Sequence, residues 1–173
     1  MMKKLIIAII GILIVSIGFA GVLQYYGKII GNVNVQPPVF YVSTDCLGSV
    51  CKLYINSLPG DYSGTVEKNS VYFDSQPLNV ESWYRGEWKI VLKLKGTTEN
   101  QRVDYYLRFA NSDYKSICNG YISISTQEEE VTISCKSNSI ELTSQHYLEL
   151  FLASKSNFVV YADGSTKIEV TST

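Results

Sequence analysis

The sequence has few of the residues on which enzyme active sites and nucleic-acid interfaces depend. It contains one histidine, His146, so no second histidine is present to share a metal ion, and no serine or cysteine motif surrounds a nucleophile. Charged residues make up 18% of the chain and the net charge is −1, which does not indicate nucleic-acid binding. No phosphate-binding glycine loop or dinucleotide fingerprint occurs. We therefore interpret His146 as a surface residue in a turn and expect no cofactor.

Metal binding is also weakly indicated. The acidic run Glu128–Glu130 suggests calcium ligands or, more simply, a solvated hairpin end. Asp163-Gly164-Ser165 resembles part of a calcium loop but is also a common tight turn between strands. The spacing of the four cysteines does not match a zinc ribbon, and no two of the sixteen acidic residues are selected as a catalytic pair. We expect no metal site and no catalytic site.

Residues 1–23 have the pattern of an export signal or a single membrane anchor. Lys3 and Lys4 precede the apolar run Leu5–Leu23, which predicts a hydrophobic helix. Gly18 and Ala20 are small residues at the −3 and −1 positions of a signal cleaved after Ala20. The length of the apolar run is at the lower edge for an uncleaved transmembrane helix. Either interpretation places the rest of the chain outside the membrane, at the cell surface or in the extracellular space.

Residues 39–173 are predicted to form one all-β domain. Apolar and polar residues alternate with period two in many short segments, and no stretch after residue 36 has a convincing helical period. Turn residues separate these segments at close spacing, which is typical of an antiparallel β-sandwich of jelly-roll or immunoglobulin-like kind. The expected strands are 39–43, 52–55, 71–73, 87–95, 102–109, 121–125, 131–135, 139–142, 147–152, 158–162 and 167–171.

The even number of cysteines in an exported chain predicts disulfides. If Ser125–Glu128 turns a hairpin, Cys118 and Cys135 lie directly opposite each other in its two strands, within disulfide reach. Cys46 and Cys51 would then close a small loop between two earlier strands.

The densest aromatic cluster is formed by Trp83, Tyr84 and Trp88. On a β-sandwich these side chains are candidates for stacking on sugar rings. The alternative is that Trp88 begins the core face of the next strand and that Trp83 packs at the edge of the sandwich.

Residues 24–38 connect the apolar segment to the β-rich body and contain a strand-like alternation. Ile29, Val33 and Val35 lie on one face of this segment, and Pro37-Pro38 separates it from the body. It is either the first strand of its own sandwich or a strand donated to the sheet of a neighbouring molecule.

The basic start, the long apolar leader, Leu23-Gln24-Tyr25-Tyr26-Gly27 and Ile30 to Phe40 resemble small exported archaeal β-sandwich proteins related to TasA/camelysin-type filament subunits of biofilm matrix. The resemblance implies a jelly-roll domain that polymerises by donating its N-terminal strand, with Ile29, Val33 and Val35 as donor residues and signal cleavage to free the N-terminus. The paired cysteines depart from the cysteine-poor bacterial members.

Two functions of different classes follow. The first is a non-enzymatic cell-surface structural protein, a pilus-like filament subunit that associates with itself or with other surface proteins. The alternative is a membrane-anchored extracellular binding module for carbohydrate or protein. A secreted hydrolase, which would need two acids together in a cleft, is the third hypothesis.

Overall fold

The eleven strands in the described part of the domain follow the alternation of apolar and polar side chains along the sequence. The structure is a computed structural model, and it describes residues 37–78, 82–83, 86–142 and 145–172. Pro37–Thr173 forms one compact unit. The strands are β1 (Val39–Leu47), β2 (Val50–Ile55), β3 (Gly64–Asp74), β4 (Ser82–Trp83), β5 (Gly86–Gly96), β6 (Gln101–Ala110), β7 (Tyr114–Ile124), β8 (Glu129–Ser137), β9 (Ile140–Glu141), β10 (Tyr147–Ala162) and β11 (Lys167–Ser172).

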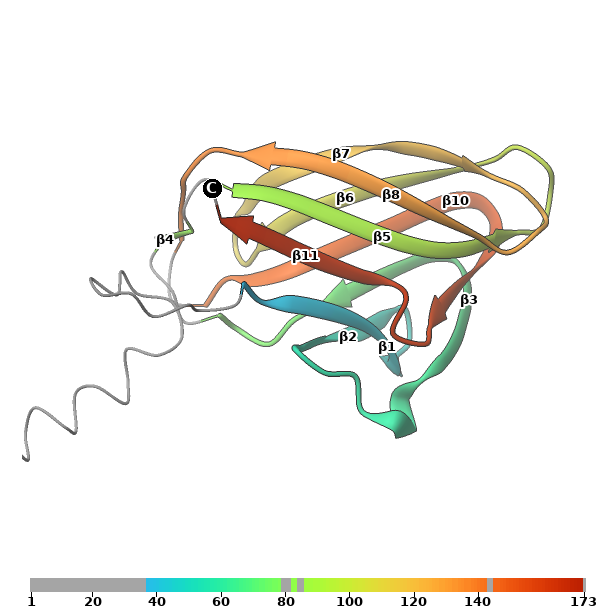
Figure 1. Cartoon of the computed structure of the whole chain (residues 1–173), viewed down its shortest axis with the longest axis horizontal. Coiled ribbons are helices and arrows are strands. Elements are labelled where there is room, and N and C mark those ends of the chain that lie inside the picture. Colours follow the sequence, from blue (N-terminus) through green and yellow to red (C-terminus); the bar gives the residue numbers. More distant parts are fainter. Residues whose placement is uncertain (1–36, 79–81, 84–85, 143–144, 173) are drawn as a thin grey trace, which may run out of the picture. The chain divides into compact units, whose positions relative to one another are not determined.

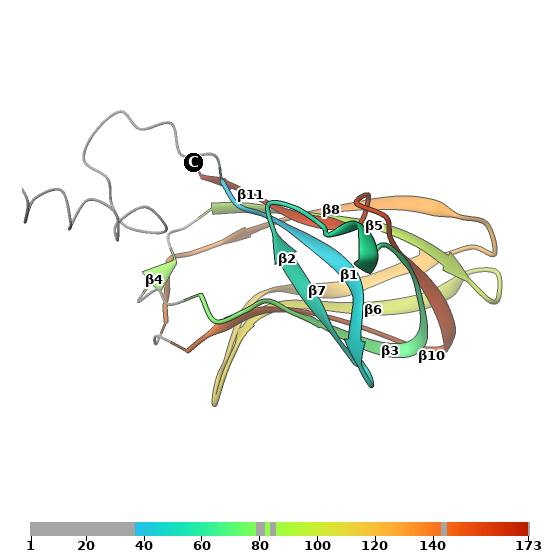
Figure 2. The ribbon, with the colours of Figure 1, turned by 90° about the horizontal axis from the view of Figure 1, so that it is seen from below.

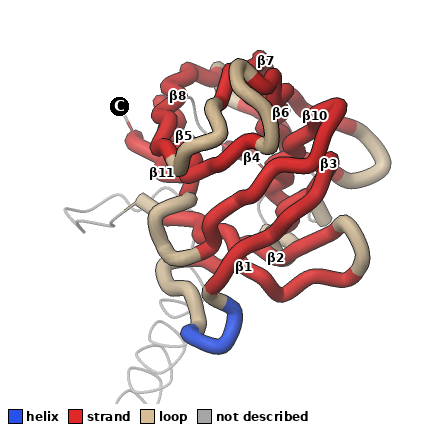
Figure 3. Tube along the Cα trace, turned by 90° about the vertical axis from the view of Figure 1, so that its right-hand side faces the viewer, coloured by secondary structure: helices blue, strands red, loops and turns tan. Residues whose placement is uncertain are grey.

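Helical structure in the described part of the chain is confined to a single 3-10 turn, η1 (Gly60–Tyr62), shown in Figure 3. Among the described residues, no helix is long and apolar enough to cross a membrane. The hydrophobic helix predicted for residues 1–23 lies outside those residues, as do the connecting residues 24–36.

Nine strands form one sheet in the order β7-β6-β10-β3-β2-β1-β11-β5-β8. The sheet folds over on itself, so that β7, β6, β10, β3 and β2 form one layer and β1, β11, β5 and β8 form the other (Figures 1 and 2). All of its pairings are antiparallel except β2–β3, which is parallel. The prediction of an all-β sandwich is thus confirmed, with one parallel pair that the sequence did not indicate.

The longest strand, β10, closes one end of the sandwich. Two separate strands were predicted in this region, at 147–152 and 158–162, and that prediction is wrong. β10 continues through both segments, with a register shift against β3 between Ala153 and Phe158. Beyond the shift, Phe158 pairs with Gly96 of β5 as well as with Lys68 of β3, so this one strand joins both layers.

The core lies between the layers. The core forms because alternate residues of each strand are apolar and point inward, and β5 shows this most clearly. Its alternating apolar residues are all completely buried: Trp88, Ile90, Leu92 and Leu94. Leu107 and Phe109 of β6 and Leu148, Leu150 and Leu152 of β10 are also completely buried and complete the apolar interior from the other layer. Burial of alternate side chains is the main stabilising contribution, at about 1.5–3 kcal/mol for each fully buried large residue.

Both predicted disulfides are present, joining Cys46 to Cys51 and Cys118 to Cys135. The hairpin geometry used to predict the second bond is wrong. β7 pairs with β6, whereas β8 pairs with β5, so the turn after Ile124 carries the chain from one layer to the other. The bond between Cys118 and Cys135 therefore joins the two edge strands of the sheet across the open side of the sandwich.

Candidate ligand-binding face

One face of the layer formed by β2, β3, β10, β6 and β7 points away from the core, and we call it the outer face. Phe73, Leu150 and Leu107 point inward and are completely buried. Because successive side chains in a strand point to opposite faces, the residues between them point outward. The register of the strands then determines which outward residues are neighbours.

Three aromatic side chains of the outer face lie in one row, which we call the aromatic row: Tyr72 of β3, Phe151 of β10 and Tyr106 of β6. Phe151 is in register with both other residues. The rings of Tyr72 and Phe151 are stacked with their centroids 4.3 Å apart, and the Tyr106 ring lies 5.9 Å from that of Phe151. Tyr106 is 39% exposed, and the other two are half-buried. The row is therefore an ordered aromatic surface that solvent reaches.

Residues of the neighbouring strands extend the aromatic row at both ends. Val50 of β2 is in register with Tyr72 and is 43% exposed. Asn119 of β7 is in register with Tyr106 at the other end. Since adjacent strands lie 4.7–4.9 Å apart, the extended row across five strands is roughly 20 Å long.

A second row, which we call the charged row, runs beside the first. It consists of Asp74, Glu149 and Arg108, each two residues from a member of the aromatic row and again in mutual register. The Arg108 guanidinium donates a hydrogen bond from Nε to Oε1 of Glu149 at 2.5 Å, and its terminal nitrogen forms an ion pair with the same oxygen at 2.5 Å. The Tyr114 ring lies against Arg108, with 3.9 Å between the guanidinium carbon and the ring centroid. Glu149 is only 4% exposed, and Arg108 is its ion-pair partner in this buried position.

Asp74 has a different environment from Glu149. Burial and the nearby negative charge of Glu149 raise the pKa of Asp74 to about 6, and Arg108 offsets only part of this effect. Its Oδ1 atom is buried and has no hydrogen-bond partner among the described residues. Asp74 is thus the least satisfied polar group of the outer face.

The lysine that lies opposite Asp74 on β2 forms its ion pair with a different carboxylate. Lys52 of β2 is in register with Asp74. Its ammonium group, however, forms an ion pair with Asp45 at 2.7 Å, and Asp45 also accepts a hydrogen bond from Tyr54. The contact with Lys52 lowers the pKa of Asp45.

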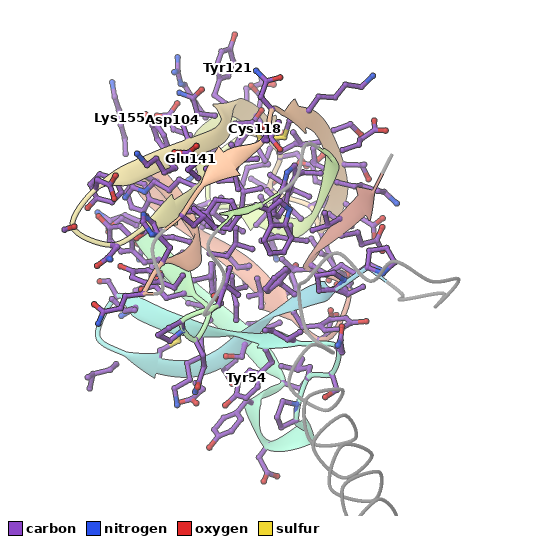
Figure 4. The ribbon with its side chains drawn as sticks, turned by 90° about the vertical axis from the view of Figure 1, so that its left-hand side faces the viewer. Tyr54, Asp104, Cys118, Tyr121, Glu141 and Lys155 are labelled. Carbon is purple, nitrogen blue, oxygen red and sulfur yellow. A yellow bond between two sulfur atoms is a disulfide. The ribbon has the colours of Figure 1, made fainter. Side chains whose placement is uncertain are left out.

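The far end of the outer face carries a further tyrosine. Tyr121 of β7 is 60% exposed and projects away from the sheet in Figure 4. The Arg102 guanidinium lies 4.2 Å from its ring centroid and forms an ion pair with Asp104. Aromatic and hydrogen-bonding groups therefore continue along the face beyond the aromatic row.

The predicted stacking residues Trp83 and Trp88 are not on this face. Trp88 is completely buried and donates a hydrogen bond to the Ser137 hydroxyl at 2.9 Å, and Trp83 is 8% exposed. Both indole rings pack against Phe109, with centroids 5.4 and 5.8 Å away. The packing alternative is the one that the structure supports, and the stacking interpretation is wrong for these two residues. Tyr84 lies outside the described residues.

His146 also differs from its prediction. It precedes β10 as expected, but it is 2% exposed and therefore is not a surface residue. Its Nε2 atom lies 2.9 Å from Oδ1 of Asp113. This contact links the start of β10 to the turn between β6 and β7.

The two segments considered as calcium ligands, Glu128–Glu130 and Asp163-Gly164-Ser165, both contact Lys93. Glu128 and Asp163 form ion pairs with Lys93 at 2.8 and 3.0 Å. Asp163 also accepts hydrogen bonds from Ser165 in the predicted tight turn, in which Gly164 has a φ of 91°. Within the described residues, no cluster of histidine, cysteine and acidic side chains is arranged to hold a metal ion.

The donor-strand residues Ile29, Val33 and Val35 lie outside the described residues, so strand donation stays a prediction. The aromatic row was not predicted. Each of its members occupies an outward position of a recognised strand, which is a weak signal by itself. Only the long-range register brings positions 72, 106 and 151 together.

No family model matches the sequence, and no curated protein matches it. Among solved structures, an α-amino acid ester hydrolase is similar over 78% of this chain, with a TM-score of 0.58 and 8% identity. The chain spans only 35% of the length of that hydrolase. A CBM4 carbohydrate-binding module matches 59% of the chain and 61% of its own length, with a TM-score of 0.44 and 6% identity.

The C-terminal CBM6 of LamC, a marine laminarinase from Zobellia galactanivorans, matches 78% of this chain and 99% of its own length, with a TM-score of 0.43 and 10% identity. Only the similarity to the ester hydrolase has a TM-score above 0.5, and at 8% identity it supports the β-sandwich fold alone.

Proposed function

We propose that this protein is an extracellular carbohydrate-binding module whose ligand lies along the aromatic row. The observation that carries the proposal is the register of Tyr72, Phe151 and Tyr106 on three adjacent strands. Their side chains form a continuous aromatic surface on a rigid sheet, so little conformational entropy is lost when a ligand is placed on it.

The chemistry of the outer face fits a sugar. Sugar rings present apolar C–H faces and a rim of hydroxyl groups, and aromatic rings offer a matching apolar surface. Arg108, Asp74 and Asn119 supply donors and acceptors beside that surface. A row roughly 20 Å long suits an extended oligosaccharide better than a single sugar.

The disulfides support an extracellular location. Both join strands of the described domain, and such bonds persist in oxidising compartments. They agree with the export signal or anchor read from residues 1–23. We place this binding function ahead of the filament hypothesis because the described residues supply a surface for it.

A glycan array probed with the full chain tests the proposal, together with two tyrosine variants. Tyr106→Ala removes the exposed member of the aromatic row. Tyr62→Ala is a matched control, because Tyr62 is 38% exposed but belongs to η1 and stacks on Tyr54 instead. We expect oligosaccharide binding that Tyr106→Ala weakens at least about tenfold, or 1.4 kcal/mol, and that Tyr62→Ala retains. Equal effects of the two variants would contradict the proposal.

A further inference from the structure

The charged row carries more negative than positive charge. Asp74 and Glu149 are directly opposed on β3 and β10, and like charges in such positions repel each other. Arg108 is the one cation of the row, and both its hydrogen bond and its ion pair go to Glu149. Asp74 is left with no ion pair among the described residues of the face.

Neighbouring groups do not offset this negative charge. Lys52, in register with Asp74, is held by Asp45. Burial and the negative charges of Asp74 and Glu149 raise the pKa of Tyr147, which precedes Glu149 on the same face of β10. The groups around Asp74 are therefore Glu149 and Tyr147 of β10, the engaged Lys52 of β2 and, one strand further away, Arg108 of β6. Together they leave a net negative site.

The site lies next to the aromatic row. Tyr72 precedes Asp74 by two residues on the same face of β3, and its ring is stacked on Phe151. A cation placed beside Asp74 therefore also lies near the faces or edges of aromatic rings, which attract cations when the face is presented. The same place thus offers a half-buried anion and an apolar surface.

We infer that the ligand of the outer face is an amino-sugar oligosaccharide, with a sugar ring on the aromatic row and its ammonium group at Asp74. This inference rests on the proposed function and names the ligand class. An ammonium group supplies both the positive charge and the hydrogen-bond donors that the Asp74 carboxylate lacks. Asp74 as a residue is only partly buried, so the contact with the ammonium group is assigned to the side of the carboxylate that solvent reaches and not to the buried Oδ1 position.

The inference predicts a pH profile that a neutral ligand would not show. Asp74 binds a proton below pH about 6 and then no longer attracts a cation. At high pH the sugar amine loses its own proton and its charge. Affinity therefore passes through a maximum between the two pKa values and declines on both sides.

Calorimetric titration of the full chain in detergent, with its disulfides intact, tests the inference. The probes are a glucosamine hexamer, its N-acetylated form and a glucose hexamer. We expect the glucosamine hexamer to bind at least tenfold more tightly than the other two near pH 6.5. Asp74→Asn should remove this preference, whereas Asp104→Asn, which neutralises an acid elsewhere on the same face, should retain it.

The possible failures are distinguishable. Equal affinity for the three sugars, or a preference that survives in Asp74→Asn, overturns the amino-sugar inference and leaves the proposed function standing. Failure of the wild-type chain to bind any of the sugars, together with tight binding of oligolysine, overturns the inference in favour of a cationic peptide. Absence of all binding on a broad glycan array contradicts the proposed function itself.

Discussion

Cys118 of β7 and Cys135 of β8 are covalently joined although neither strand forms hydrogen bonds with the other in the sheet. Their Cα atoms are 6.2 Å apart. The bond thus connects the edges of the two layers, in addition to the turn after β7 and the packing of the core.

Removal of this disulfide should destabilise the domain more than removal of the other one. The Cys118–Cys135 bond spans 17 residues and the Cys46–Cys51 bond spans 5. Loop-closure entropy then predicts losses of about 3 and about 2 kcal/mol for the respective Cys→Ala pairs. Urea unfolding of the two double variants measures the difference, and a larger loss from the shorter loop would contradict this explanation.

Arg108→Met should be strongly destabilising because it leaves the buried Glu149 without its partner. Loss of one member of a buried ion pair costs about 3 kcal/mol. Adding Glu149→Leu to the same chain should recover most of the loss, because no buried charge then remains. The free energies of unfolding of the single and double variants decide this, and an unrecovered loss would show that Arg108 acts mainly by packing against Tyr114.

Asp74→Asn should stabilise the domain at neutral pH. The folded protein holds a proton on Asp74 up to pH about 6, whereas the unfolded chain releases it near 3.8, so ionisation opposes folding as pH rises between these values. Allowing for solvent screening of the half-buried carboxylate, we expect a gain of about 1–2 kcal/mol above pH about 7.

That gain should disappear below pH 3.8, where Asp74 is protonated in both states. Thermal unfolding of the variant and the wild type across this pH range measures it. A gain that does not depend on pH would indicate a packing effect instead of an electrostatic one.

Trp88→Phe should reduce stability without changing ligand affinity. The substitution removes the indole N–H donated to Ser137 and leaves space beside Trp83, at an expected cost of about 1–3 kcal/mol. Glycan binding below the unfolding temperature should equal that of the wild type. A selective loss of binding in a folded variant would restore the tryptophans as ligand contacts.

The sequence predicted the parts of the structure that depend on local alternation. The inward face of β5 could be read directly from Trp88, Ile90, Leu92 and Leu94, since every second residue is large and apolar. The predicted cysteine pairing was also correct, but the predicted hairpin between the two cysteine strands was not. The residues around Ile124 carry no local signal that the chain crosses there from one layer to the other.

The candidate site could not be predicted in the same way. Tyr72, Tyr106 and Phe151 are neighbours only because β10 pairs with β3 and β6, and such long-range pairings leave no local signal in the sequence. Conversely, Trp83, Tyr84 and Trp88 are close in sequence, but Trp83 and Trp88 are core residues.

The most direct test of the central claim is to map where an oligosaccharide binds by backbone amide NMR of the isotopically labelled full chain. Titration with the best ligand from the glycan array should shift the amides around Tyr72, Phe151 and Tyr106, with little change in β11 and the middle of β5. Shifts concentrated in β1, β11, β5 and β8, with none along the aromatic row, would contradict the account.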